Sequence, residues 1–203
     1  PASVKPIFEI KDNTSPSYTS YNVHFQDVTF GDASGFPNTS NAIGCAILSP
    51  PASSSLIRNV TFTSCNFISL YQASYTEYSS IKDPVIGVYF NQCSSYQTNI
   101  KTFDFIGFNI VMNGCSHGER NSFKVGTYNE SDCIVNYGSS SGVSQKFSMN
   151  FCDIRYLSYL KSGCVAGSLS LKNASYVSVY GSILKHGSNV IENCSTVRID
   201  ASV

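Results

Sequence analysis

Tyrosines and carboxylates gather in one turn-rich segment of the chain, residues 71–84. Aromatic faces can stack against sugar rings, and carboxylates can accept hydrogen bonds from sugar hydroxyls or transfer protons as general acids and bases. The segment therefore predicts a carbohydrate platform on an inserted loop. Its candidate binding residues are Tyr71, Tyr75 and Tyr78, and its candidate catalytic residues are Glu77 and Asp83. The alternative is that the tyrosines cover the flank of the scaffold or an interface between subunits.

A second group of chemically active side chains lies in another predicted insertion, residues 116–132. His117 and Arg120 are candidate binding residues there, and Glu119 is a candidate catalytic acid. An acid, a base and a cation on one loop would suit hydrolysis or elimination of a polysaccharide, provided that folding gives them the right mutual geometry. The alternative is a solvated turn with a local ion pair.

A repeated pattern predicts the scaffold that must position these loops. In residues 59–67, apolar side chains alternate at Val60 and Phe62, the alternation shifts by one residue at Ser64, and it then resumes. Alternation with period two indicates a strand with one buried face, and a shift of one residue indicates a bulge or corner. Related copies are predicted at residues 23–30, 88–95, 103–110, 147–154, 169–176 and 190–197.

The residue after each corner is usually small and apolar, so these residues are expected to stack in one buried column. The predicted column consists of Val28, Cys65, Cys93, Phe108, Cys152, Ala174 and Cys194. Stacked repeats of strand, corner and strand are typical of a parallel β-solenoid, in which each coil buries its inner face against its neighbours. The sequence thus predicts one all-β domain over residues 1–203, and the column cysteines are expected to be free thiols that fill volume.

Paired carboxylates would indicate glycoside hydrolysis, which needs two of them about 5–5.5 Å or about 6.5–9.5 Å apart. Stacked coils could supply such a pair from one outward column. One predicted column consists of Thr29, Asn66, Ser94, Asn109, Asp153 and Ser175, and another of His24, Thr61, Tyr89, Asp104, Ser148 and Ser170. Each contains a single acid, so no carboxylate ladder is expected, and enzymatic activity is left undecided.

Composition excludes several classes of function. The chain has 203 residues, 13 basic and 13 acidic side chains and a formal net charge of zero. Without a basic surplus to bind phosphates, no nucleic-acid partner is expected. No apolar run approaches the length of a membrane span, so no membrane partner is expected either. The three histidines are scattered and no Cys-x-x-Cys pair occurs, so neither a metal site nor a cofactor is predicted.

The rung at residues 59–67, repeated with Asn-Cys corners, resembles the right-handed parallel β-helix proteins of the pectate-lyase-like superfamily. Among these, residues 23–203 look most like the β-helix of bacteriophage tailspikes. The resemblance implies a right-handed parallel β-helix with inserted surface loops, forming a segment of a longer tailspike or fibre in the virion. It also implies a homotrimer that binds bacterial surface polysaccharide and in many cases cleaves it. No catalytic signature of the family is present, so no catalytic residue is transferred.

Two alternative functions stay open. A non-catalytic structural segment of a viral fibre would show the same coils and the same lack of paired acids. A secreted, disulfide-bonded viral or eukaryotic glycoprotein would instead use the 8 cysteines and the six Asn-x-Ser/Thr sequons. Two of these sequons, at Asn173 and Asn193, are expected at inner corners without room for a glycan.

Overall fold

Parallel β-strands make up the described part of the chain. The computed structural model describes residues 5–11, 21–31, 42–49, 57–70, 72–78, 87–98, 103–106, 109–117, 135–138, 146–155, 169–185 and 189–200. These residues form three sheets, in which every strand pair is parallel. Within those ranges, no helix is long and apolar enough to cross a membrane.

The three sheets are called A, B and C. Sheet A contains β1 (Lys5–Lys11), β4 (Ala42–Ser49), β7 (Gln72–Tyr78), β10 (Phe103–Ile106), β13 (Val135–Gly138), β16 (Leu169–Lys172) and β19 (Val190–Glu192). Sheet B contains β2 (Tyr21–Gln26), β5 (Ile57–Thr63), β8 (Gly87–Asn91), β11 (Asn109–Asn113), β14 (Lys146–Asn150), β17 (Tyr176–Tyr180) and β20 (Val197–Asp200). Sheet C contains β3 (Thr29–Gly31), β6 (Asn66–Leu70), β9 (Ser94–Thr98), β12 (Ser116–His117), β15 (Asp153–Arg155) and β18 (Ile183–Lys185).

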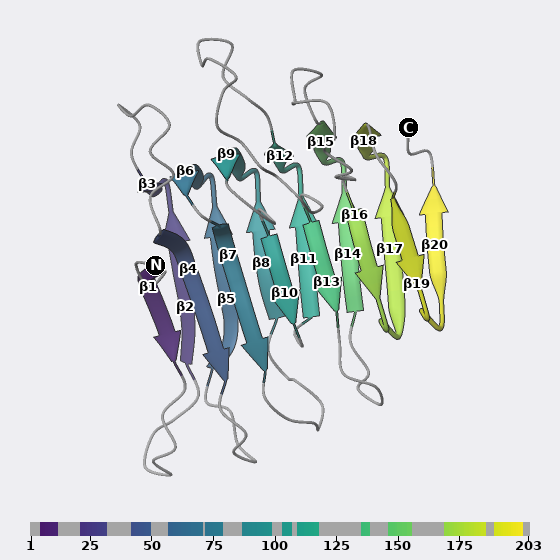
Figure 1. Cartoon of the computed structure of the whole chain (residues 1–203), viewed down its shortest axis with the longest axis horizontal. Coiled ribbons are helices and arrows are strands. Elements are labelled where there is room, and N and C mark those ends of the chain that lie inside the picture. Colours follow the sequence, from purple (N-terminus) through teal and green to yellow (C-terminus); the bar gives the residue numbers. More distant parts are fainter. Residues whose placement is uncertain are drawn as a thin grey trace.

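The chain visits the sheets in the order A, B, C and then returns to A, so that three consecutive strands make one coil. Each strand pairs with its equivalents in the coils before and after it. The coils follow one another in chain order along the long axis of the molecule (Figure 1). This all-β arrangement of parallel sheets fits the solenoid class that the repeats predict.

The core consists of columns of equivalent side chains from successive coils. Phe25, Phe62 and Phe90 occupy one column of sheet B, with ring centroids 5.1 and 4.8 Å apart and ring planes 8° and 7° from parallel. The column continues with Met112, Met149 and Val179. Because strands of adjacent coils lie about 4.8 Å apart, flat rings can stack at the spacing that the backbone imposes.

Every corner between sheets B and C contains one residue in the left-handed region. These residues are Asp27, Ser64, Gln92, Gly114, Phe151 and Gly181, with φ between 51° and 60°. The turn leaves the backbone hydrogen-bond ladder between coils intact. The backbone N–H of Ser64 donates to the Asn91 carbonyl, and the backbone N–H of Ser94 donates to the Cys65 carbonyl, both at 2.9 Å. The corner therefore changes the chain direction without leaving these backbone groups unpaired.

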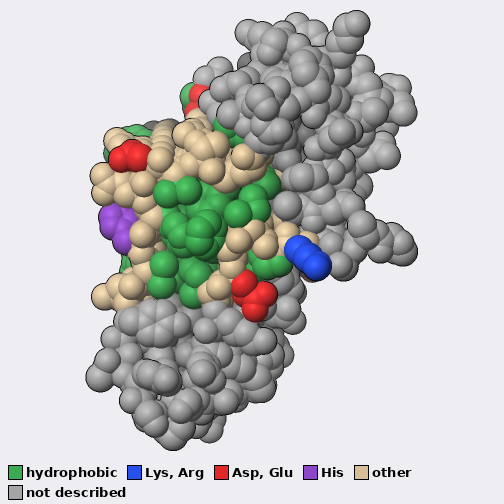
Figure 2. Space-filling model, turned by 90° about the vertical axis from the view of Figure 1, so that its left-hand side faces the viewer, with side chains coloured by type: hydrophobic (Ala, Val, Ile, Leu, Met, Phe, Trp, Pro, Cys, Tyr) green, Lys and Arg blue, Asp and Glu red, His purple; other side chains and the backbone are tan. Residues whose placement is uncertain are grey.

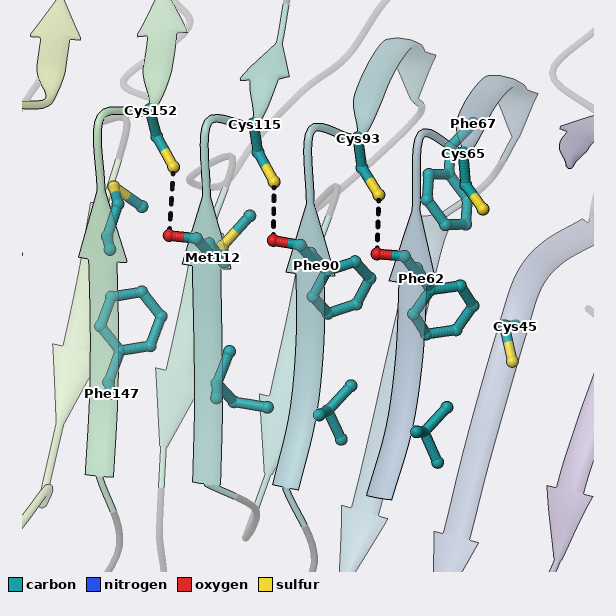
Figure 3. Packing of buried hydrophobic residues seen from close by; sticks show 14 of the residues in the cluster. Cys45, Phe62, Cys65, Phe67, Phe90, Cys93, Met112, Cys115, Phe147 and Cys152 are labelled. Atoms are coloured by element: carbon teal, nitrogen blue, oxygen red, sulfur yellow. Dashed lines mark hydrogen bonds between the residues drawn. The ribbon is translucent and has the colours of Figure 1, made fainter. Parts of the chain in front are cut away.

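A column of small side chains follows this corner inside the core. It consists of Val28, Cys65, Cys93, Cys115, Cys152 and Ser182. The thiols of Cys93, Cys115 and Cys152 each donate to a carbonyl of the preceding coil, at 3.5, 3.3 and 3.5 Å (Figure 3). All six cysteines that the structure describes are free thiols, in agreement with the expectation for this column.

Two members of the predicted column lie at a different corner. Ala174 and Cys194 follow Asn173 and Asn193, which turn the chain between sheets A and B with φ of 57° and 54°. The same local pattern of strand, left-handed residue and small residue serves both corners, and the sequence does not distinguish them. Both asparagines are exposed, so the expectation that they lie at inner corners is also wrong.

The predicted copy at residues 103–110 is wrong for the same reason. It joins β10 of sheet A to β11 of sheet B, with its predicted corner outside the described residues. The fourth coil contributes Cys115 to the column instead of Phe108, after a glycine corner at Gly114.

Both predicted insertions begin with strand residues. Residues 72–78 of the first insertion form β7 in the middle of sheet A, and Ser116 and His117 of the second form β12. The first error has a physical cause, because Ser74 occupies a buried position where an apolar residue would mark a strand. Its hydroxyl is satisfied by donating to the Cys45 carbonyl at 3.3 Å, so a polar residue is tolerated there.

Hydrophobic side chains form a patch on the N-terminal end of the described coils, which Figure 2 shows. Phe8 is 47% exposed, and its ring packs edge-on against Phe25 at 5.3 Å and Phe30 at 5.8 Å. At the other end, Val197 and Ile199 are also exposed. The end coils have a neighbour on one side, so their inner columns end at the surface.

Truncating the aromatic column should destabilise the protein strongly. We expect Phe62→Ala to lower the free energy of unfolding by about 3–5 kcal/mol, because the ring is fully buried and stacked on both faces. The matched control is Thr61→Ala on the outer face of the same strand, with an expected change within about 0.5 kcal/mol. Urea unfolding followed by circular dichroism measures both, and equal effects would contradict the assignment of this column to the core.

Buried thiols should react slowly in the native protein. Burial raises the pKa of Cys45 to about 12, so little of the nucleophilic thiolate forms at pH 8 and more forms only as pH approaches that pKa. We expect iodoacetamide to modify Cys45 at least about tenfold more slowly than the half-buried Cys194, as measured by peptide mass mapping. In denaturant all 8 cysteines should react and the mass should be unmodified. Disulfides with added glycan mass would instead support the secreted glycoprotein.

Candidate functional site

The outer face of sheet B carries mainly neutral hydrogen-bonding side chains. Because strand side chains alternate, Val60 and Phe62 point into the core and their neighbours point outward. Asparagine recurs on this outer face, at Asn22, Asn59, Asn91, Asn109, Asn113 and Asn150. Amides, hydroxyls and tyrosines on a regular sheet offer donors and acceptors at fixed intervals of one coil.

Three of these asparagines form a side-chain ladder that leads to the corner between sheets B and C. The Asn113 amide donates to Asn91 Oδ1 at 2.9 Å, and the Asn150 amide donates to Asn113 Oδ1 at 2.9 Å. The side-chain amides are therefore held in one orientation. The ladder ends at Asn150, the residue before Phe151. A ligand at this corner would meet a polar group whose position is already fixed.

An exposed aromatic pair occupies this corner. Phe151 is 66% exposed and Tyr180 is 44% exposed. Their ring centroids lie 5.1 Å apart with the planes at 86°, an edge-to-face contact. Phe151 directly follows β14, the sheet B strand of one coil, and Tyr180 is the last residue of β17, the sheet B strand of the next coil.

Gly181 makes room for the phenyl ring. A Cβ atom at Gly181 would lie 2.8 Å from Cδ1 of Phe151 and 2.9 Å from Cε1. Gly181 is itself left-handed, with φ of 57°, so glycine is favoured there on two independent grounds. The ring of Phe151 thus lies over the backbone of the following corner, beside Tyr180.

One ion pair lies near this corner. Asp200 lies opposite Tyr180 in the next coil, and it accepts a hydrogen bond from the guanidinium of Arg198. The interaction with Asp200 raises the pKa of Arg198. Within this pair the two opposite charges offset each other, so the pair adds little net field to this part of the outer face.

The sequence candidates in residues 71–84 lie elsewhere, on sheet A. Tyr75, Glu77 and Tyr78 belong to strand β7, whereas Tyr71 and Asp83 lie outside the described residues. The expected inserted loop is therefore wrong for residues 72–78, which are part of the scaffold itself, whereas the carbohydrate platform stays a prediction. Tyr75 and Glu77 occupy alternate positions, and Tyr78 has the opposite parity.

One acidic pairing was not expected from the sequence. Asp104 on β10 lies directly opposite Tyr75 on β7, and Glu77 lies two residues farther along β7. One strand spacing combined with a shift of two residues places the two backbone positions about 8 Å apart. Glu77 and Asp104 are thus diagonal neighbours in sheet A, although no outward column contains two adjacent acids among the registers described here.

The candidates in residues 116–132 are only partly placed. His117 is the second residue of β12, opposite Ser95 on β9 and Ile154 on β15. Glu119 and Arg120 lie outside the described residues. The structure therefore corrects the expected loop at His117, and the expected grouping of His117, Glu119 and Arg120 stays a prediction.

The predicted outward columns also change. Asp104 and Ser170 belong to sheet A, so they do not share a column with His24 and its sheet B partners. Asp153 stays in a sheet C column without a second acid, but Ser116 and Ile183 take the places expected for Asn109 and Ser175. No group of three or more metal-ligating side chains is found among the residues that the structure describes.

Sequence reasoning did not identify Phe151 and Tyr180 as candidates. The signal was present, because Phe151 is the one bulky residue at a corner position otherwise occupied by Asp27, Ser64, Gln92 and glycines. Its contact with Tyr180 could not be inferred without the coil register. Comparison with known proteins adds no assignment, since no protein family, no curated protein and no solved structure matches the chain. The ligand must be inferred from the chemistry of the faces.

Filling the space at Gly181 should disturb the aromatic corner. We expect Gly181→Ala to lower the free energy of unfolding by more than about 1 kcal/mol, because alanine is strained at this φ and its Cβ meets the Phe151 ring. Gly114→Ala is the matched control, since Gly114 has a φ of 60° but its added Cβ would find only Gln92 Cγ at 3.7 Å. Urea unfolding compares the two.

A double mutant separates strain from collision at Gly181. In a Phe151→Ala background the ring is gone, so Gly181→Ala should cost about the same as Gly114→Ala. If the excess cost of Gly181→Ala persists without the ring, the packing of Phe151 over this glycine is incorrect.

Proposed function

We propose that this chain recognises a neutral polysaccharide of the bacterial surface through the outer face of sheet B, as part of a phage tailspike or fibre. The observation that carries the proposal is the row of neutral amides, hydroxyls and tyrosines on one regular face, which ends at an exposed aromatic corner. Sugars offer many hydroxyls and few charges, so such a face matches them in kind. Rigid strands keep these groups in place and so reduce the entropy lost on binding.

The proposed assembly rests on the resemblance of the repeated rung at residues 59–67 to tailspike β-helices. We propose a right-handed winding, since crossovers between parallel strands of one sheet are right-handed in about 98% of cases. We also propose one domain over residues 1–203, a homotrimer and a place in the virion. The absence of net charge supports a partner other than nucleic acid.

Hydrolysis of a polysaccharide at sheet A, apart from the proposed binding face of sheet B, is a second candidate activity. It is favoured by one observation, the diagonal placement of Glu77 and Asp104 on adjacent strands. Their backbone positions lie about 8 Å apart on adjacent strands, and glycoside hydrolysis needs two neighbouring carboxylates. Release of reducing ends from the bound polysaccharide tests it, and Glu77→Gln and Asp104→Asn should each abolish that release without weakening binding.

Binding to a panel of bacterial glycans tests the main proposal. We expect the full chain to bind at least one neutral polysaccharide on an array of purified capsular and O-antigen polysaccharides. Because the face has little net charge, affinity should change less than about twofold between about 0.05 and about 0.5 M salt. Duplex DNA on the same array is the negative control.

Two results would contradict this proposal. Failure to bind any polysaccharide on the array would leave the structural fibre segment as the better interpretation. A steep loss of affinity with added salt would show that binding depends on charge, which the neutral face of sheet B does not explain.

A further inference from the structure

Phe151 breaks the rule that the other corners follow. Bulky residues rarely adopt positive φ, because their Cβ approaches the backbone carbonyl, and such strain tends to persist where function requires it. The equivalent residues in other coils are polar or glycine. Phe151 gains little from burial, since the residue is 66% exposed. Neither backbone preference nor core packing therefore explains a phenylalanine at this position.

The surroundings hold this ring in place. Tyr180 meets it edge-on at 5.1 Å, and Gly181 lacks the Cβ that would displace it. Asn150 precedes it, and its side-chain amide is fixed by the hydrogen bond that it donates to Asn113 Oδ1 at 2.9 Å. An exposed ring that is locked by its neighbours is preorganised for contact with a ligand.

We propose that Phe151 is the stacking anchor for one neutral hexopyranose unit of the polysaccharide, and this inference rests on the proposed function. An aromatic face is electron-rich, so it attracts a sugar ring that turns a side of C–H groups towards it. Asn150, whose amide is held by Asn113, and Tyr180, whose ring contacts Phe151, add hydrogen-bonding groups at this corner. The charges of Arg198 and Asp200, on the next strand, offset each other, which suits an uncharged sugar.

The decisive variant separates stability from binding. Asparagine tolerates positive φ far better than phenylalanine, so Phe151→Asn should keep or raise the melting temperature. The same change removes the stacking face, so we expect the polysaccharide captured by the wild type on the array to bind about tenfold more weakly or worse. Phe151→Tyr preserves an aromatic face and should bind within about threefold of the wild type.

A matched control is available two coils earlier. Gln92 occupies the equivalent left-handed corner and is exposed. Gln92→Asn makes a similar change in backbone preference without touching an aromatic ring. Its affinity for the same polysaccharide, measured by isothermal titration calorimetry, should stay within about twofold of the wild type.

Each outcome decides the question. Weaker binding by Phe151→Asn at an unchanged melting temperature, with Gln92→Asn unaffected, supports the anchor. Equal binding by Phe151→Asn and the wild type overturns the anchor but leaves the proposed function standing. If the wild type binds no polysaccharide, both fall together. Sedimentation velocity completes the test, because dissociation of an oligomer by Phe151→Asn would make the ring a subunit contact and would overturn the anchor as well.

Discussion

In-register stacking of parallel coils is the constraint on which the rest of this structure depends. A corner can recur in every coil only if it turns the chain and still pairs its backbone groups with the coils on both sides. The left-handed residue at each corner between sheets B and C satisfies both conditions. The backbone hydrogen bonds from Ser64 to Asn91 and from Gly181 to Asp200 are examples. Once the corner is set, each position of one coil lies over its equivalent in the next.

Stacking makes the interior a set of columns, each with its own tolerance of size and chemistry. The column of Phe25, Phe62 and Phe90 changes to methionine and then to valine, so it accepts apolar side chains of different shapes. The small column behind the corner accepts either a thiol or a hydroxyl. Ser182 donates to the Tyr180 carbonyl at 3.1 Å, much as the column cysteines donate to theirs. These thiols therefore act as small core residues that also satisfy a backbone acceptor.

The repeat itself was predictable from the sequence, whereas its phase was not. Residues 23–30, 59–67, 88–95 and 147–154 each span sheets B and C as the alternation predicts, because most of their inward positions are apolar, with the buried Ser95 as an exception. Asn173 and Asn193 were assigned to the wrong corner, because the corner between sheets A and B has the same local sequence pattern. Strand β7 was missed because its buried Ser74 depends on a hydrogen bond to Cys45, in another coil. Local patterns identify a corner, and only pairing between coils shows which corner it is.

The candidate site was harder to predict than the scaffold because stacking leaves the outward positions largely unconstrained. Tyr75, Glu77 and His117 looked like loop residues when judged by type, yet their backbones lie within the sheets. Phe151 and Tyr180 meet only because their coils are adjacent, and loops of varying length conceal that adjacency in the sequence. The same freedom makes exceptions informative. A polar residue or glycine at a corner follows from the fold, but an exposed, strained phenylalanine needs a cause outside folding, and the proposed sugar at the face of its ring would provide one.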